Sequence, residues 1–229
     1  MRFEQKDGAL TCKRRGETLR IEAWGTNALR VRATRHPEFS GRDWALSQDV
    51  DAGPATIEEA QGDPYVRDGK PHTTTGCMRI ANGRISCVVN PAGVLSFYRD
   101  STLILREYFR NYDGTISRES HCLKVEGRTF KARIGGDWRI QVKFEASPGE
   151  CIFGMGQYQQ ERANLKGCML DLEQRNSQVS VPFYVSNLGY GFLWNNPAVG
   201  RVTFGENLTE WISECSKEMD YWICVGDTP

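Results

Sequence analysis

The sequence predicts an all-β fold built as an antiparallel β-sandwich. Apolar and polar residues alternate along most of the 229 residues, and a period of two places successive side chains on opposite faces of a strand. Turn-forming Gly, Asn and Pro residues recur roughly every ten residues, which is typical of short antiparallel strands. No segment shows the periodicity of an amphipathic helix.

The composition excludes several classes of protein. Hydrophobic residues make up 39% and charged residues 25% of the chain, within the range of globular proteins. Lys plus Arg and Asp plus Glu both number 29, so no basic excess indicates a nucleic-acid partner. No apolar run approaches the ~20 residues of a membrane-spanning helix. The first residues lack the apolar core of a secretory signal, so we expect a cytoplasmic protein without a membrane partner.

Metal, cofactor and disulfide chemistry are not indicated. No pair among the eight cysteines has CxxC spacing, which argues against a zinc ribbon or a thioredoxin motif. We expect reduced thiols that are mostly buried, because free cysteine behaves as a small hydrophobe. His36, His72 and His121 lie in different segments, and their spacing predicts neither a catalytic triad nor a metal site.

The first third of the chain predicts one hairpin and one long connection. Residues 19–24 and 29–33 alternate, and 25–27 form the turn between them. Alternation then stops over 34–75, where Gly and Pro are frequent, and we expect an irregular connection with at most one short strand near 55–58. A loop of this length needs support, so we expect it to pack on the sandwich or on a neighbouring domain, with Trp44 as its anchor.

The remaining strands follow in close succession. Asn82-Gly83 supplies the positive φ angles of a tight hairpin turn. The segment 138–146 alternates most regularly, with Ile140, Val142 and Phe144 on one face. Strands are predicted at 77–80, 84–89, 94–98, 103–107, 121–125, 138–146, 153–157, 179–185, 190–194, 202–205, 210–215 and 219–225.

A polar crossing over 157–178 lies between the predicted strands 153–157 and 179–185. It is rich in amide side chains, and strands on both sides of a polar loop are a typical way to present a binding edge. Gly154 and Gly156 are interpreted as residues that serve the backbone conformation of the chain. They are not a dinucleotide fingerprint, because no helix follows and the third glycine is missing.

Five motifs in this region resemble the N-terminal β-sandwich domain of glycoside hydrolase family 31, which contains α-glucosidases and α-xylosidases. They are FGMGQ (153–157), NLKG (164–167), L-x-Q-x-N (172–176), VPFYVSN (181–187) and GYGFLWNNP (189–197). The resemblance implies one galactose-mutarotase-like supersandwich over 1–229. It also implies that a catalytic (β/α)8 barrel would follow residue 229.

The resemblance implies a retaining α-glycoside hydrolase that acts on α-linked xylosyl or glucosyl oligosaccharides. Such an enzyme uses two carboxylates, which the family carries on its barrel. We therefore expect this chain to be the N-terminal portion of a longer enzyme and to be inactive alone. Its expected role is to support the barrel and to place the loop 157–178 near the substrate subsite. Homo-oligomerisation is left open.

Substrate-binding candidates are Asn176, Arg175 and Gln157. Asn176 matches a position at which many members carry an Asp that contacts sugar hydroxyls, and an amide can also donate to and accept from a hydroxyl. Alternatively, Asn176 caps a turn. For Gln157, Gln159 and Asn164 the alternative is that their amides satisfy loop backbone groups. Arg175 either pairs with a barrel carboxylate or points to solvent.

Two other functions are compatible with an antiparallel β-sandwich. A free-standing carbohydrate-binding module would need an outward platform of aromatic rings. Alternation puts Phe183 and Tyr184, and likewise Tyr221 and Trp222, on opposite faces, so at least half of these aromatics belong to the core, and we expect the outward ones to contact the barrel. An aldose epimerase would need a His acid and a Glu base, and only His121 lies in a predicted strand.

Overall fold

The structure of the protein, a computed structural model, describes residues 2–47, 50–51, 53–62, 64–67, 70–111 and 124–227. All the regular secondary structure in these described residues is β-strand, and every strand pairing among them is antiparallel. The predicted all-β antiparallel fold is confirmed. No helix in the described ranges is long and apolar enough to cross a bilayer.

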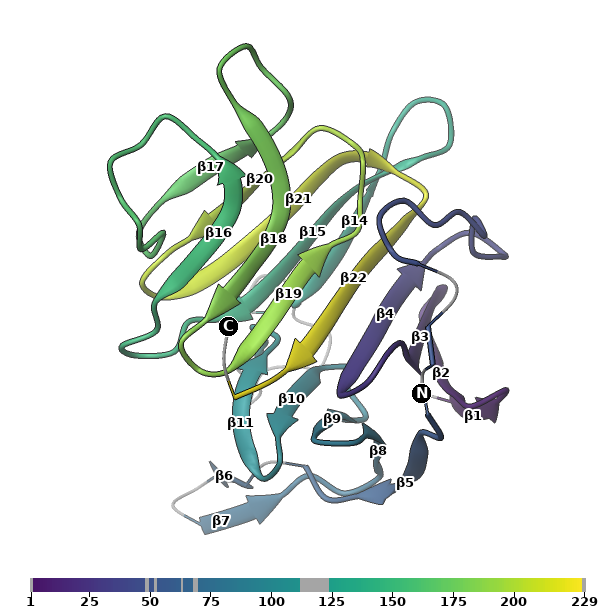
Figure 1. Cartoon of the computed structure of the whole chain (residues 1–229). Helices are drawn as coiled ribbons and strands as arrows, with labels where there is room; N and C mark the ends of the chain where they lie inside the picture. The colour runs from purple at the N-terminus through teal and green to yellow at the C-terminus, as the bar shows by residue number, and fades with distance from the viewer. Residues whose placement is uncertain are drawn as a thin grey trace.

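The strands are numbered in chain order (Figure 1). Those of the first half are β1 (Arg2–Lys6), β2 (Ala9–Arg14), β3 (Glu17–Ala23), β4 (Ala28–Thr34), β5 (Thr56–Ala60), β6 (Pro64–Arg67), β7 (Lys70–Thr73), β8 (Cys77–Asn82), β9 (Ile85–Val89), β10 (Leu95–Arg99) and β11 (Thr102–Arg106). Those of the second half are β12 (Arg110–Asn111), β13 (Lys124–Val125), β14 (Arg128–Ala132), β15 (Trp138–Glu145), β16 (Ile152–Gln157), β17 (Met169–Leu172), β18 (Val179–Ser186), β19 (Tyr190–Trp194), β20 (Gly200–Phe204), β21 (Leu208–Ser216) and β22 (Glu218–Val225).

One large sheet organises the domain. It contains eight strands in the order β1-β2-β3-β4-β22-β19-β18-β16. Two five-stranded sheets have the orders β11-β10-β9-β8-β5 and β14-β15-β21-β20-β17, and β6-β7 and β12-β13 form separate hairpin-like pairs. The last strand, β22, lies between β4 and β19 and joins the early strands to the late ones.

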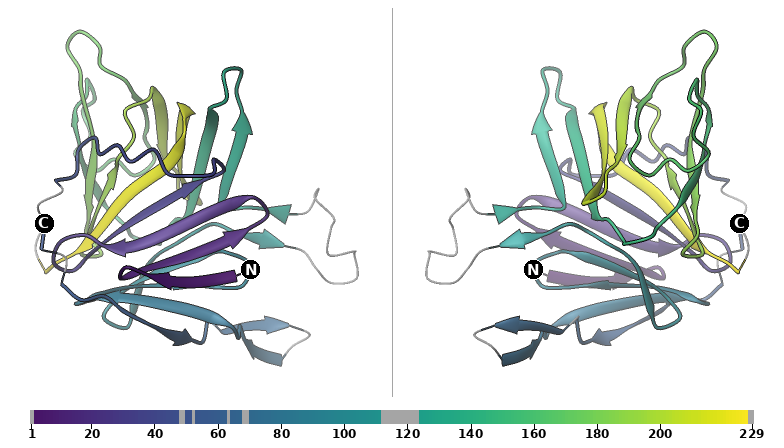
Figure 2. Two further views of the ribbon diagram at one scale, coloured as in Figure 1. Left: turned by 90° about the vertical axis from the view of Figure 1, so that its right-hand side faces the viewer. Right: turned by 90° about the vertical axis from the view of Figure 1, so that its left-hand side faces the viewer.

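Both five-stranded sheets pack on the same large sheet. Phe97 of β10 contacts the Tyr221 ring of β22 at a centroid distance of 6.2 Å, and Phe144 of β15 contacts it at 5.8 Å. The side views show β1–β3 (purple) lying over the strands of the β5–β11 sheet (blue) (Figure 2). The two smaller sheets also meet, because the Tyr108 amide donates to the Lys143 carbonyl at 2.8 Å. The result is the supersandwich that the resemblance implies.

The core follows the predicted alternation. Ile140, Val142 and Phe144 are fully buried on one face of β15. Six aromatics of β18, β19, β21 and β22 are buried, and several of them stack or meet edge to face: Tyr184, Tyr190, Phe192, Trp194, Trp211 and Tyr221. Phe183 and Trp222 are half-buried and belong to the opposite face.

Four strands of the three large sheets were not predicted from the sequence: β1, β2, β14 and β17. The β1 edge strand is largely exposed, so it has no strict alternation. A usable signal was nevertheless present, since the turn between β1 and β2 is Asp7-Gly8, and both residues have positive φ. The predicted strand 121–125 is described only at β13, and its remainder lies outside the described residues.

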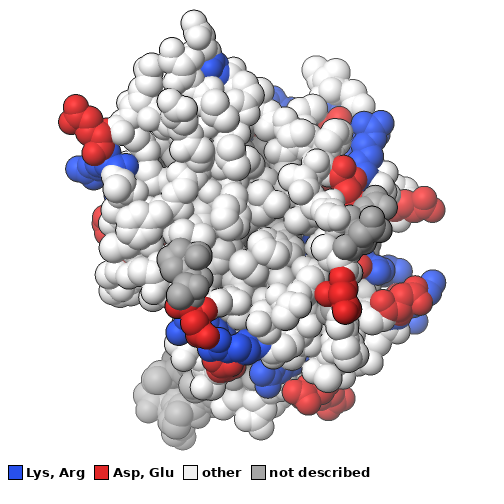
Figure 3. All heavy atoms as spheres, viewed as in Figure 1, with Lys and Arg blue, Asp and Glu red and all other residues white. Residues whose placement is uncertain are grey.

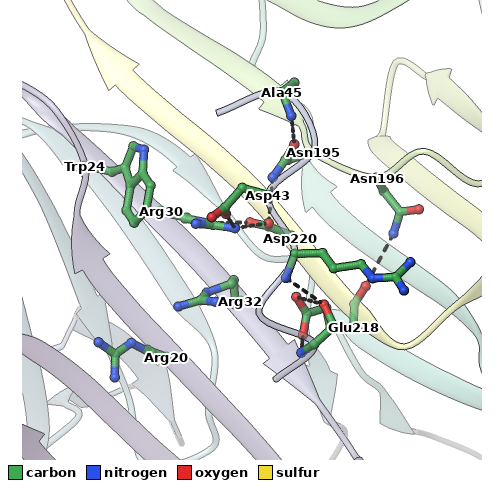
Figure 4. Close-up of polar contacts among 12 residues, drawn as sticks. Arg20, Trp24, Arg30, Arg32, Asp43, Ala45, Asn195, Asn196, Glu218 and Asp220 are labelled. Atoms are coloured by element: carbon green, nitrogen blue, oxygen red, sulfur yellow. Dashed lines mark hydrogen bonds and ion pairs between the residues drawn. The ribbon is translucent and has the colours of Figure 1, made fainter. Parts of the chain in front are cut away.

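The predicted connection over 34–75 contains β5 and the hairpin β6–β7, so it is not irregular throughout. Trp44 does not anchor the connection to the sandwich, because its side chain is 53% exposed, and its contact with a neighbouring domain stays a prediction. The segment is held instead by its neighbours Ser40, Asp43 and Ala45 (Figure 4).

The seven cysteines that the structure describes are free thiols. Three are buried, three are half-buried and Cys215 is exposed, so the expected burial holds for only part of them. The eighth, Cys122, lies outside the described residues.

Candidate functional site

The polar crossing starts at a β-bulge in β16. Gly154, Met155 and Gly156 have φ values of 121°, 70° and 91°, and the register with β18 shifts between the two glycines. A Cβ on Gly156 would lie 2.2 Å from the Val179 carbonyl oxygen, so only glycine fits. The bulge buries Met155 completely and leaves Gln157 exposed at the end of the strand. The interpretation that both glycines serve the backbone conformation is confirmed.

The NLKG motif attaches the crossing to the start of β16. The Asn164 side-chain oxygen accepts hydrogen bonds from the amides of Ile152 at 3.0 Å and Lys166 at 3.1 Å. The Leu165 amide donates to the Ile152 carbonyl at 2.8 Å. The Asn164 side chain therefore satisfies backbone N–H groups, which confirms the alternative given for it in the sequence analysis.

The crossing then connects the two layers of the sandwich. Its middle forms β17, which pairs with β20 of the facing sheet, so the segment 157–178 is not a loop throughout. The Tyr158 hydroxyl lies 3.0 Å from the Asp171 carbonyl oxygen and 2.7 Å from the Ser180 hydroxyl. This ring braces β17 against β18.

The crossing ends in a tight turn over residues 175–178. The Gln178 amide donates to the Arg175 carbonyl at 3.0 Å, and Ser177 adopts a φ of 69°. The Gln174 amide group bonds both the N–H and the carbonyl of Ser180, at 3.1 and 2.9 Å, which pins the base of the turn. Asn176 occupies the second turn position, at the tip of the β17–β18 connection that rises above the sheets (Figure 1).

The side chain of Asn176 is exposed and makes no hydrogen bond to the described residues. It does not cap the turn with its side chain, although it is part of the turn. Its amide is free to donate and to accept, which is what recognition of a vicinal diol needs. Gln157 is also exposed, and it pairs in register with Val179, the residue that follows the turn. The structure therefore places Gln157 and Asn176 at the same end of the β16–β18 pair.

Arg175 already has partners within the chain. Its guanidinium contacts the carboxylates of Glu173 and of Asp171, the latter at 3.3 Å. Asp171 in turn accepts a hydrogen bond from Arg201 at 2.9 Å. The charge of Arg175 is therefore balanced locally, so it does not require a carboxylate from another domain.

The outer faces of the two layers differ. On the β14–β21 layer the outward side chains form ion pairs and polar contacts, such as Arg139 with Glu214 at 3.1 Å and Gln141 with Glu210 at 2.6 Å. On the large sheet the outward side chains of β18 and β19 are apolar, as are Phe153 of β16 and Trp222 of β22. We call this set the outer apolar patch: Phe153, Val179, Val181, Phe183, Leu193 and Trp222.

The outer apolar patch is accessible in this chain. Phe153 is 39%, Val179 50% and Val181 45% exposed. The centre of the face that carries β18 and β19 is free of charged side chains, which gather along its margins (Figure 3). An uncharged, exposed sheet face of this kind usually marks an interface.

Three comparisons with known proteins bear on this geometry. The sequence pattern of the glycosyl hydrolase 31 N-terminal galactose mutarotase-like domain matches residues 18–202. The chain belongs to glycoside hydrolase family 31. This family 31 chain is 44% identical over 221 residues to the uncharacterized family 31 glucosidase ORF2 of Pseudescherichia vulneris. The alignment covers 93% of this chain and 39% of that protein. The chain is 29% identical over 218 residues to α-xylosidase A of Aspergillus niger, covering 92% of the chain and 28% of that protein.

The solved structures agree with the family assignment. A family 31 α-xylosidase from a soil metagenome, complexed with xylose, superposes with a TM-score of 0.87 and 42% identity, over 100% of this chain and 33% of that one. A dextranase of Flavobacterium johnsoniae has a TM-score of 0.70 at 14% identity, which shows the shared fold alone. The chain thus spans about two fifths or less of the relatives it matches.

Three features of the candidate site were not predicted from sequence: the bulge at Met155, the contacts of the Tyr158 hydroxyl and the local pairing of Arg175. A G-x-G at the end of a strand is a signal for a bulge, because glycine inside a strand often marks one. The Tyr158 and Arg175 contacts depend on the β17–β20 pairing, which no local pattern indicates. Among the described residues, no cluster of His, Cys, Asp and Glu could hold a metal ion.

Proposed function

We propose that this chain is the non-catalytic N-terminal domain of a retaining α-glycoside hydrolase of the α-xylosidase or α-glucosidase type. The observation that carries the proposal is the pattern of coverage. Similarity extends over 93% of this chain but only 39% of the Pseudescherichia vulneris glucosidase. The metagenomic α-xylosidase structure likewise matches 100% of this chain over only 33% of its own length.

The domain would support its own catalytic region through the outer apolar patch. Val181 faces outward and is 45% exposed, and Phe183 and Leu193 face outward half-buried, whereas the other layer is ion-paired towards solvent. Burial of apolar area contributes about 25 cal/mol per Å², so the polypeptide gains stability if its catalytic region covers this face. We propose that region as the occupant of the patch.

The turn over 175–178 would reach the substrate subsite. Its tip residue Asn176 has free amide groups, and its base is fixed by Gln174 and by the bulged strand β16. A fixed turn with a free amide suits hydrogen bonding to a neutral saccharide, because little entropy is lost when the contact forms. Gln157 would supply a second amide at the same end of the sheet.

The test compares the 229-residue chain with the complete polypeptide of its gene. Both are assayed for release of p-nitrophenol from the aryl α-xyloside and the aryl α-glucoside. We expect hydrolysis by the complete polypeptide and none by the 229-residue chain. The preferred aryl glycoside then decides between the two types. Turnover by the 229-residue chain would contradict the non-catalytic role.

A further inference from the structure

The strap, residues 36–47, crosses the outer face of β4 and β22 and is tied down on both sides of Trp44. The Ser40 amide and hydroxyl donate to the Glu218 carboxylate at 2.8 and 3.1 Å. Asp43 forms an ion pair of 2.5 Å with Arg30, and the Ala45 amide donates to the Asn195 side chain at 3.0 Å. Figure 4 shows these ties converging from β4, β22 and the residue after β19.

The groups that hold the strap are themselves fixed. Arg30 makes two hydrogen bonds to Asp220, at 3.1 and 2.6 Å, and Asn195 donates to the same carboxylate at 2.7 Å. The guanidinium also lies 4.5 Å from the centroid of the Trp24 ring. The strap therefore has a defined position although it contains no strand.

Trp44 is the residue that this arrangement exposes. It is 53% exposed, whereas the other five tryptophans of the chain are buried or half-buried. A large aromatic on the surface loses the stabilisation that burial would give. Because Asp43 and Ala45 already attach the strap, Trp44 is not needed to hold it.

An open pocket of about 170 Å³ lies beside the Trp44 ring. This is far more than the ~15 Å³ that one water needs. Its rim carries Asp137 and Lys217, which form no ion pair with the described residues. The Asp137 carboxylate accepts a weak hydrogen bond from the Cys215 thiol at 3.8 Å and keeps capacity for another, and the Arg42 guanidinium lies 5.8 Å from the Trp44 ring centroid. Asn196 also lines the pocket, but its side chain is engaged with Ser213 and Ser216.

We propose that Trp44 and this pocket form a binding site for one ring of a neutral saccharide. A pyranose has an apolar face of C–H groups and an equator of hydroxyls. The indole would stack on the first, as aromatic π-faces attract such partially positive hydrogens. Asp137 and Lys217 would bind the hydroxyls, with the carboxylate accepting and the ammonium donating. The rim carries both signs of charge, which does not favour an anionic ligand.

This inference is independent of the proposed role of Asn176. The strap lies over β4 and β22, whereas the turn over 175–178 extends from the β16–β18 edge (Figure 1). The site would hold a saccharide chain on the domain surface and would not take part in bond cleavage.

The test uses the 229-residue chain, which contains the closed core formed by all three large sheets. Binding of D-xylose and of isomaltotriose is titrated by isothermal titration calorimetry, which does not depend on the indole that the variants remove. We expect saturable binding in the millimolar range, and Trp44→Ala to weaken it roughly tenfold, whereas Trp44→Phe keeps a stacking ring and most of the affinity. Phe153→Ala is the matched control, because it removes an exposed aromatic of the outer apolar patch and should leave the affinity unchanged.

A second pair of variants tests the rim. Asp137→Asn and Lys217→Met should each lower the affinity about threefold without changing the unfolding transition, since a hydroxyl contact at an open rim is weak. The proposal fails if neither saccharide gives a saturable signal, or if Trp44→Ala binds as well as the wild type. It also fails if Trp44→Ala alters only the sedimentation of the protein, which would assign the ring to a protein contact.

Discussion

The guanidinium of Arg30 and the carboxylate of Asp220 form a two-point hydrogen-bonded ion pair, although the residues lie 190 positions apart. Both are buried, and the pair joins β4 to β22 in the middle of the large sheet. Asp43 of the strap and Asn195 complete the surroundings of the two charges.

Replacing Asp220 with Ala should destabilise the domain strongly. The change leaves Arg30 buried with Asp43 as its remaining carboxylate, and breaking a buried pair of this kind costs about 3–5 kcal/mol. Arg133→Ala removes a half-exposed pair with Glu214 and should cost less than about 1 kcal/mol. Urea denaturation of both variants measures the difference, and equal midpoints would show that the buried pair adds nothing.

The bulge in β16 predicts a second asymmetry, between two glycines. Gly156→Ala should cost clearly more than Gly135→Ala. Both positions have positive φ, at 91° and 103°, so both variants carry backbone strain of about 1–3 kcal/mol. Only at Gly156 would the new Cβ also meet backbone atoms, whereas Gly135 has open space around it. The free energies of unfolding of the two variants decide, and similar values would mean that the bulge relaxes easily.

The turn over 175–178 predicts an effect on catalysis without an effect on folding. In the complete polypeptide, Asn176→Ala should lower kcat/KM for aryl α-glycosides roughly tenfold, as expected for loss of one or two hydrogen bonds to a sugar. Its exposed side chain makes no contact that supports the fold, so the unfolding midpoint should not change. Gln5→Ala removes an exposed amide from β1, at the opposite edge of the large sheet, and serves as the control. Unchanged kinetics in Asn176→Ala would return this residue to a purely structural role.

The outer apolar patch predicts a difference between the two layers. In the complete polypeptide, Val181→Asp should lower the thermal midpoint if the catalytic region covers the patch as proposed, because it then places a charge in a buried interface. Thr203→Asp puts the same side chain on the outer face of β20 and should be tolerated. Differential scanning fluorimetry compares the two. A tolerated Val181→Asp would show that the patch stays in solvent.

Burial raises the pKa of the Cys12 thiol to about 12, with smaller opposing effects of Arg128 and Glu17. In the unfolded chain the thiol ionises near its usual pKa of 9.0, while the folded protein keeps the proton. The unfolded state then binds fewer protons, so the free energy of unfolding should fall as the pH rises from about 9 towards 12. Cys12→Ala removes this contribution, and its urea midpoint should fall less steeply between pH 8 and 10.5. Parallel slopes for the two proteins would contradict the shifted pKa.

Much of this architecture could be predicted because alternation reports burial directly. The strand β15 is an example in which one local pattern decides the structure. The hairpin after β8 is also confirmed, but Asn82 still pairs with Ile85, so the turn residues are Gly83 and Arg84, and of the Asn-Gly pair only Gly83 has a positive φ. The strap could not be predicted in the same way. A large aromatic such as Trp44 is the type of residue that usually anchors a loop. The strap is attached instead by Ser40 and Asp43, and their partners, Glu218 and Arg30, lie on two different strands. Polar contacts between distant segments leave no periodic signal in a sequence.

The candidate site shows the same division. The amides of Gln157 and Asn176 could be selected by their position between strands, but their free side chains and the engagement of Asn164 became evident only from hydrogen-bond geometry. The outer apolar patch was anticipated in part, since Phe183 and Trp222 must face away from Tyr184 and Tyr221. The β17–β20 pairing that brings Arg175 to Asp171 lay beyond any local pattern.

The central position of β22 affects how the domain is made on the ribosome. Until residues 218–225 have emerged, the early strands end in an open edge at β4 and the late strands in another at β19. Open strand edges of this kind invite wrong pairing while synthesis continues at ~5–20 residues per second. The family pattern ends at residue 202, so a shortened version cut there would lack the strand that closes the large sheet. Folding of the large sheet is therefore completed late, by the last strand of the described chain.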